Sequence, residues 1–387
     1  MRTKRPIKPL AFQAYFIPVL LLAVTGLIVS LYLAYSHYKN YTDLQYQSFC
    51  AISQAINCDT VSQSPYSIFI IPVPIWALIG YALILLLLPF AWQPKGRDGR
   101  MWSMIMLMAL GYNGVSVALA FVSAYLIGSY CILCILIYVV NLFLLWFAWL
   151  IRRRFASGGI IRNIRDDWRF MWQRKRIFLP GSAVFSAAVI LVIVLLPSYW
   201  RLTPEPLSSE ITYGLTTDGH AWFGAENPQI EIEMFSDYQC FQCKKMHVYL
   251  RKLLGGQQQK IRVIHRHYPM DHEVNEIVKE PFHVGAGKMA MLAIYAASNG
   301  KFWEMSDLLF EIGGHHQQID LNRVAQKTGL PAAALVGALK APVIRKRLTY
   351  DIWQGMKLRI VGTPSFVING KVYEGSIPVD VLQKYLR

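Results

Sequence analysis

The sequence predicts a protein in two parts, an α-helical membrane bundle followed by an α/β domain. Hydrophobic residues make up 54% of the 387-residue chain and charged residues only 16%, which is typical of membrane proteins. Five apolar runs, each near the ~20 residues that a spanning helix needs, all end before Pro197. Beyond Pro197, strand-like and helix-like segments take turns around a Cys-x-x-Cys pair, which favours an α/β redox domain.

The five predicted spans are separated by polar or basic segments. They cover residues 14–34, 68–90, 101–126, 131–150 and 177–196. The first run follows a basic N-terminus, as a cleaved signal peptide would. It is longer than the ~7–15 apolar residues of a signal peptide and lacks a clear small-x-small cleavage site, so we expect a retained span.

Charge predicts the orientation of these spans. The chain has a formal net charge of +16, and most of the excess lies before Pro197. The basic segments are the N-terminus and residues 91–100 and 151–176, which the positive-inside rule assigns to the cytoplasm. This distribution excludes a nucleic-acid patch as the reason for the charge. An odd number of spans then puts the second part outside, and all six cysteines lie outside or at the outer membrane edge, where disulfides persist.

We expect four sections along the chain. Residues 1–150 form a membrane domain, 151–198 a basic cytoplasmic loop and the fifth span, 199–227 a linker, and 228–387 the α/β domain. In this last section, predicted strands at 229–235 and 260–267 flank a helix that begins after Cys240. A helical insertion over 281–338 and a helix over 342–357 precede two short strands at 365–368 and 372–373, and a final helix closes the chain.

The six cysteines form three pairs with redox-like spacing. Two thiols at helical spacing can close a disulfide, and at the mouth of a membrane helix they can pass electrons to a lipid-soluble carrier. Cys240 begins a predicted helix, whose unpaired N–H groups and dipole favour a thiolate there, while the more buried Cys243 resolves the mixed disulfide. The candidate catalytic residues are Cys50, Cys58, Cys131, Cys134, Cys240 and Cys243.

Less reactive interpretations remain open for some of these residues. The Cys240 pair could be half of a zinc site, but no second pair with tetrahedral spacing lies in the same domain. The Cys50 pair could be a static loop disulfide. His265-x-His267 and His315-His316 have no cysteine or acid at ligand spacing, so we interpret them as strand-face or surface residues and expect no metal.

The second part resembles the DsbA-like branch of the thioredoxin superfamily. The segments 235–243, 300–303 and 362–370 carry the resemblance, which covers most of residues 228–387. It implies that Pro364 is a cis-proline facing the Cys240 pair and that Thr363 and Pro364 contact the thiol substrate. Phe241-Gln242 carries no positive charge, so we expect a less stabilised thiolate than in relatives with histidine there. Met234 stands where related folds often bury an acid.

Residues 12–150 resemble the vitamin K epoxide reductase family in its bacterial form fused to a thioredoxin-like domain. The residues that carry the resemblance are Cys50, Cys58-Asp59, Ser64, Cys131-Ile-Leu-Cys134 and Tyr138. It implies a four-helix core, which leaves the fifth span as a connection, and a quinone of ubiquinone or menaquinone type beside Cys134, Ser64 and Tyr138. Packing alone for Tyr138, and a turn before Pro65 for Ser64, stay as alternatives.

Together the two resemblances imply a quinone-dependent thiol–disulfide oxidoreductase of the bacterial inner membrane. Electrons from reduced exported proteins would pass from Cys240/Cys243 to Cys50/Cys58, then to Cys131/Cys134 and the membrane quinone pool. Cys50 would receive the electrons, and Cys58 would exchange with Cys131. Two alternatives are a quinone or quinone-epoxide reductase that uses protein thiols as donors, and a disulfide isomerase or chaperone-type binding module.

Overall fold

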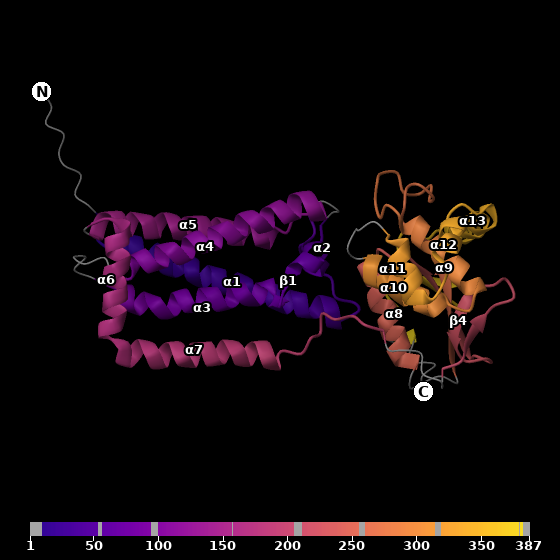
Figure 1. The fold of residues 1–387 in the computed structure, drawn as a ribbon, viewed down its shortest axis with the longest axis horizontal. Helices are drawn as coiled ribbons and strands as arrows, with labels where there is room; N and C mark the ends of the chain where they lie inside the picture. Colours follow the sequence, from indigo (N-terminus) through magenta and orange to yellow (C-terminus); the bar gives the residue numbers. More distant parts are fainter. Residues whose placement is uncertain are drawn as a thin grey trace, which may run out of the picture. The chain divides into compact units, whose positions relative to one another are not determined.

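The computed structural model confirms a helical membrane part followed by a sheet-and-helix domain (Figure 1). It describes residues 10–52, 56–93, 100–156, 158–204, 211–254, 260–313, 319–378 and 380–381. The chain divides into two compact units, residues 1–40 with 46–199, and 41–45 with 200–387. The predicted final helix and His315-His316 lie largely or wholly outside the described residues.

Among the described residues of the first unit, five helices are long and apolar enough to cross a membrane. They are α1 (Gln13–Thr42), α3 (Val73–Ala91), α4 (Trp102–Phe121, continued by a π-helical turn, Val122–Ile127), α5 (Ile132–Phe155) and α7 (Lys175–Leu195). Side chains of α1, α3, α4 and α5 form one buried core, whereas α7 has no buried residue. This confirms a four-helix core with a fifth connecting span.

The second span begins later than expected. Residues 68–72, predicted to be helical, form a tight hairpin of β1 (Ile68–Phe69) and β2 (Ile71–Pro72). Proline lacks the N–H that a helix interior uses but is accepted in a first turn, where that group is unpaired anyway. Pro74 accordingly lies in the first turn of α3, and the helix begins at Val73.

The sequence analysis expected the basic segment 151–176 to be a loop, but most of it is helical. It contains α6 (Ile160–Gln173), which runs across the bundle end and contacts α4 and α7 (Figure 1). Asn163 and Asp167, four residues apart on one helix face, are buried. The Asp167 carboxylate accepts hydrogen bonds from the N–H groups of Met101, Ser103 and Met104 at 2.7, 3.1 and 3.2 Å. It thereby satisfies donors that the first turn of α4 leaves unpaired.

The second unit is built on a six-stranded sheet in the order β3-β4-β6-β5-β7-β8. The parallel strands β5 (Ile230–Ser236) and β6 (Ile261–His267) are joined through α8 (Phe241–Leu254), and the other pairs are antiparallel. The helical insertion is confirmed as α9 (Ala286–Ser298), α10 (Phe302–Gly313), α11 (Leu321–Thr328) and α12 (Ala332–Ala338). Then follow α13 (Pro342–Lys357), β7 (Ser365–Ile368) and β8 (Lys371–Glu374).

The expected linker 199–227 contains two strands, β3 (Tyr213–Leu215) and β4 (Ala221–Gly224). Phe223 is buried in the domain core and packs edge-on against Trp303 with ring centroids 4.7 Å apart. The prolines and serines that suggested a linker all precede residue 210. The aromatic residues that follow them favour a strand, because they can pack on a half-buried sheet surface.

Candidate redox sites

The first site is a disulfide between Cys50 and Cys58, whose Cα atoms are 5.6 Å apart. Cys58 begins the short helix α2 (Cys58–Gln63), and the Asn57 side chain caps it by accepting hydrogen bonds from the N–H groups of Asp59 and Thr60. Ala51 pairs with Asn57 in a short bridge, which brings the ends of the intervening segment together. Both cysteines are buried, and the pairing that the sequence suggested is confirmed.

The second cysteine pair lies beside this disulfide. Cys131 and Cys134 are free thiols, and the Cys134 N–H donates a hydrogen bond to the Cys131 Sγ at 3.2 Å. The Asn57 N–H bonds the Tyr130 carbonyl at 2.9 Å, which fastens the disulfide segment to the residue before Cys131. Cys50, Cys58 and Cys131 consequently pack in one small buried cluster, with Cys134 against it.

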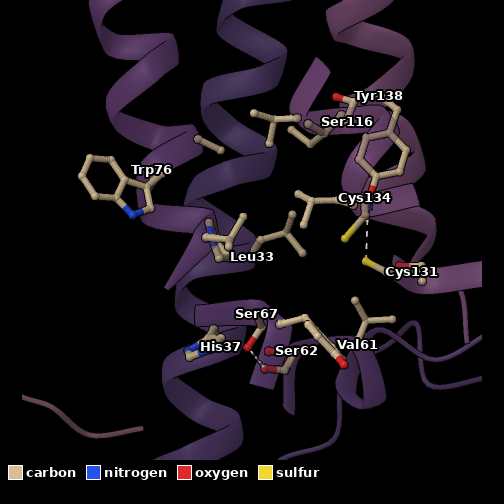
Figure 2. A pocket seen from close by; sticks show the side chains of 18 of the residues that line it. Leu33, His37, Val61, Ser62, Ser67, Trp76, Ser116, Cys131, Cys134 and Tyr138 are labelled. Atoms are coloured by element: carbon tan, nitrogen blue, oxygen red, sulfur yellow. Dashed lines mark hydrogen bonds between the residues drawn. The ribbon is translucent and has the colours of Figure 1, made fainter. Parts of the chain in front are cut away.

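A cavity of about 420 Å³ opens next to this cluster (Figure 2). Cys134 and Tyr138, one turn apart on α5, lie on one side of it, and Leu33 and Trp76 on the other. Its lining is mostly apolar and also includes Cys58, Cys131 and Ser64. The structure therefore brings together all three residues that the sequence analysis selected as quinone contacts.

Several polar residues of the cavity were not found from the sequence. His37 is buried, lines the cavity beside Ser67 and bonds the Tyr199 hydroxyl through Nδ1 at 2.9 Å. Deeper in the bundle, the Tyr81 hydroxyl donates to Asn141 Oδ1 at 2.7 Å, and Asn141 Nδ2 donates to Ser116 Oγ at 2.9 Å. Polar residues at membrane depth are uncommon, so Asn141 inside its apolar run was a usable signal.

The third pair begins α8 in the second unit. The Cys243 N–H donates a hydrogen bond to the Cys240 Sγ at 3.2 Å, and this Sγ lies 3.3 Å from the Thr363 carbonyl oxygen. The Thr363–Pro364 peptide bond is cis, as the resemblance implied. The hydrogen bond from the Cys243 thiol lowers the pKa of Cys240, while burial holds the pKa of Cys243 well above its usual range.

Asp237 is an acid near this pair that the sequence analysis did not select. Met234 is buried and apolar, and its neighbour Glu233 forms an ion pair with Arg266 at 2.7 Å. The Asp237 carboxylate is fully buried three residues before Cys240, and its charge adds to the burial that raises the pKa of Cys243. The sequence gives the position of Asp237 three residues before Cys240 but not the backbone turn that buries its carboxylate.

The two histidines of β6 lie on the strand and are buried. His265 and His267 are buried, and the ring of His265 stacks on Tyr238 with centroids 5.6 Å apart. Burial lowers the pKa of His265 to about 3, so its imidazole is neutral in the folded chain. Within the described part of the chain, no three histidine, cysteine or acidic residues are grouped as metal ligands.

Two cysteine pairs are free thiols, and in each pair one sulfur accepts a hydrogen bond from the N–H of its partner. Together with the five apolar helices found among the described residues, they place this protein among membrane thiol–disulfide oxidoreductases. The family comparisons then name both parts. Residues 17–149 match the vitamin K epoxide reductase family, and residues 231–387 match the DSBA-like thioredoxin domain. The chain is thus a vitamin K epoxide reductase family membrane domain fused to a DsbA-like thioredoxin-fold domain.

Solved structures of DsbA type resemble the second unit. A thioredoxin-like oxidoreductase from Silicibacter pomeroyi is 22% identical and covers 43% of this chain and 90% of its own, with a TM-score of 0.34. Pseudomonas aeruginosa DsbA2 is 22% identical and covers 43% of this chain and 92% of its own, with a TM-score of 0.35. BdbD from Bacillus subtilis is 17% identical and covers 45% of this chain and 94% of its own, with a TM-score of 0.35.

Two curated sequences match this chain over 159 residues. They are the Na(+)/H(+) antiporters NhaA 3 of Salinispora tropica and NhaA 1 of Salinispora arenicola. Each is 26% identical over 159 residues, which is 41% of this chain and 23% of the relative. This chain therefore spans about a quarter of the length of the curated relatives that it matches.

Proposed function

We propose that this protein makes disulfides in exported proteins by relaying their electrons through its three cysteine pairs to a membrane quinone. The observation that carries the proposal is the arrangement in the first unit. There the disulfide Cys50–Cys58 packs against Cys131, and Cys134 follows on the wall of an apolar cavity. A disulfide, a dithiol and a cavity in contact are what a relay to a lipid-soluble acceptor requires.

The cavity fits a quinone head group in size and chemistry. Ligand pockets measure about 300–1,000 Å³ and are mostly apolar with a few polar groups that orient the ligand. This cavity is within that range, and its polar groups include Tyr138, Ser64, Ser67 and His37. A bound quinone would supply the two-electron acceptor of the last step. Tyr138 and Ser64 would orient it, and the apolar lining would exclude water from Cys134.

Each thiol step is an attack by a thiolate on a disulfide. A substrate thiolate attacks Cys240, and Cys243 leaves as the disulfide breaks. The second substrate thiolate then attacks the substrate sulfur of the mixed disulfide, so that the substrate is oxidised and Cys240 and Cys243 are reduced. This dithiol reduces Cys50–Cys58 in the same way, and those thiols next reduce Cys131–Cys134. Cys131 and Cys134 finally close to a disulfide again and give up two electrons.

Orientation and location follow the charge of the connecting segments. The basic end of α5 and the basic helix α6 would face the cytoplasm, because positive residues stay inside. The cysteine pairs and the DsbA-like domain would then lie on the outer side of a bacterial inner membrane, with exported proteins as thiol substrates. Fusion keeps the domain at a high effective concentration near Cys50, so the relay need not wait for diffusion.

The test uses the full chain in detergent with a reduced dithiol peptide and a soluble quinone analogue. Peptide-dependent quinone reduction is expected for the native chain and for Ile135→Ala, which changes an exposed side chain of the same helix. Cys134→Ala should abolish it while thiol exchange at Cys240 continues. Unchanged quinone reduction in Cys134→Ala would contradict the assignment of the terminal site. Exchange at Cys240 with no quinone reduction in the native chain would favour an isomerase.

A further inference from the structure

The residues between Cys240 and Cys243 supply no positive charge, yet a histidine from a distant segment lies beside this pair. His283 precedes α9, and its Nδ1 is 2.8 Å from Oδ2 of Asp237. Asp237 is three residues before Cys240, and the Cys240 N–H donates to the Asp237 carbonyl at 3.2 Å. One buried carboxylate therefore joins the imidazole to the turn that presents the thiol.

A second set of hydrogen bonds fixes the His283 segment. The side-chain amide of Gln239, the residue directly before Cys240, donates to the Val284 carbonyl at 2.8 Å. The carboxylate of Asp271 accepts hydrogen bonds from the N–H groups of Gly285 and Gly287 at 2.9 and 3.0 Å. His283 is thus held from both sides, so its distance from Cys240 is set by the fold and not by a mobile side chain.

The charges around His283 favour an imidazolium. Burial lowers its pKa, but the charge and hydrogen bond of Asp237 together with the charges of Cys240 and Asp271 outweigh burial, so that the pKa is raised. Conversely, Cys240 faces three titratable groups. Its hydrogen bond with Cys243 and the charge of His283 lower its pKa, and Asp237 opposes them. His283 and Cys240 therefore influence each other's ionisation directly.

We propose that His283, anchored by Asp237, is the charge partner of the Cys240 thiolate and replaces the positive charge missing between the two cysteines. This makes Cys240 the better leaving group when the second substrate thiolate attacks the mixed disulfide. The substrate thiols give up two protons and two electrons. The electrons reside on the two sulfurs, one proton ends on Cys243, and the other is held on His283. The inference rests on the proposed function insofar as Cys240 is the attacked sulfur.

The test measures the ionisation of Cys240 in the reduced full chain. Alkylation by iodoacetamide is followed from pH 4 to 9, and mass spectrometry reads the peptide that contains Cys240. An opposite charge nearby shifts a pKa by about 1–3 units, so His283→Asn should raise the Cys240 midpoint by about one unit and slow its alkylation about tenfold at low pH. Asparagine suits this position because it tolerates the φ of +41° that His283 adopts.

His272→Asn is the matched control, because it makes the same change on the same segment at a partly exposed histidine. Its midpoint should equal that of the native chain. Equal midpoints for His283→Asn and His272→Asn would overturn the inference but leave the proposed relay intact. Alkylation of Cys243 before Cys240 would overturn both the inference and the order of thiols in the proposed function.

A second measurement needs no variant and is independent of folding defects. Coupling between two ionisations is reciprocal, so a thiolate at Cys240 must raise the pKa of His283 by as much as the imidazolium lowers that of Cys240. Hydrogen–deuterium exchange at the imidazole C2 position, read by mass spectrometry, gives the His283 pKa in the native chain. The pKa should be about one unit higher in the reduced chain than in the oxidised chain. Equal values would contradict the pairing.

Discussion

The Asp59 carboxylate accepts a 2.9 Å hydrogen bond from the side-chain amide of Asn40 in the last turns of α1. Its other oxygen accepts the Ser48 N–H, also at 2.9 Å. Ser48 lies two residues before Cys50, and Asp59 directly follows Cys58. One buried carboxylate therefore holds both ends of the Cys50–Cys58 disulfide segment against the end of α1.

Replacing Asp59 should make this disulfide easier to reduce. Asp59→Ala leaves two buried donors without their acceptor, at about 1–3 kcal/mol each, and releases the segment that shields Cys50. We expect dithiothreitol to reduce Cys50–Cys58 at least tenfold faster than in the native chain, measured by trapping the freed thiols with a mass label. Asp59→Asn keeps one acceptor oxygen and should give an intermediate rate. Equal rates in all three chains would exclude this clamping role.

Asp167 should be required for the stability of the bundle end. Asp167→Ala leaves three N–H groups of the first turn of α4 without their acceptor, and loss of such a cap costs about 0.5–2 kcal/mol. We therefore expect a lower thermal midpoint in detergent. Asp166→Ala is the control, because Asp166 is exposed and makes only a 3.9 Å ion pair with Arg169, and such pairs contribute about 0–1 kcal/mol. Equal midpoints for the two variants would be inconsistent with the cap.

Tyr138 offers a direct test of the cavity as a quinone site. Its hydroxyl has no hydrogen-bond partner among the described residues, so Tyr138→Phe should leave protein stability unchanged. If the hydroxyl bonds the quinone, losing about 1 kcal/mol should raise the KM for the quinone analogue about fivefold with little change in kcat. Tyr125→Phe, which alters a highly exposed tyrosine of the same unit, should change neither value. An unchanged KM in Tyr138→Phe would favour the packing role.

The features that the sequence predicted well are encoded locally. Membrane spans are runs of apolar residues, and a Cys-x-x-Cys pair before a helix carries its own geometry, so both could be found without a structure. The errors occurred where distant contacts decide the conformation. The helix at residues 160–173 is held because Asp167 finds its partners in the first turn of α4, and the strand β4 is held in the core because Phe223 packs on Trp303. Neither partner lies near these segments in the sequence.

The redox sites were predictable to a similar degree. Spacing alone indicated the six cysteines, and the resemblance added Ser64, Tyr138 and Pro364. Met234 occupies the place where related folds often bury an acid, and the buried acid Asp237 follows directly after β5 instead. His283 could not have been selected, since it lies 43 positions after Cys240 in the chain, beyond α8 and β6. Only the folded sheet brings the two segments together.

The buried imidazole of His265 should make the second unit sensitive to acid. Its pKa is about 3 in the folded chain, because of burial, and near 6.5 when unfolded. Between these two pKa values the unfolded state binds one more proton than the folded state. The contribution of His265 to the free energy of unfolding is therefore fully present above pH 6.5 and is lost as the pH falls toward 3. At pH 5 the loss is about 2 kcal/mol. Pulse proteolysis in urea, read on peptides from β5 and β6, should show this loss between pH 7 and pH 5.

His265→Gln removes the titration and should reduce the difference between pH 7 and pH 5 by about 2 kcal/mol, even if it lowers stability at both. His272→Gln changes a partly exposed histidine and should keep the native pH dependence. The neighbouring His267 is also buried, and its pKa lies well below the usual range, so some acid sensitivity should persist in His265→Gln. An unaltered pH dependence in His265→Gln would mean that the imidazole does not take up its proton on unfolding.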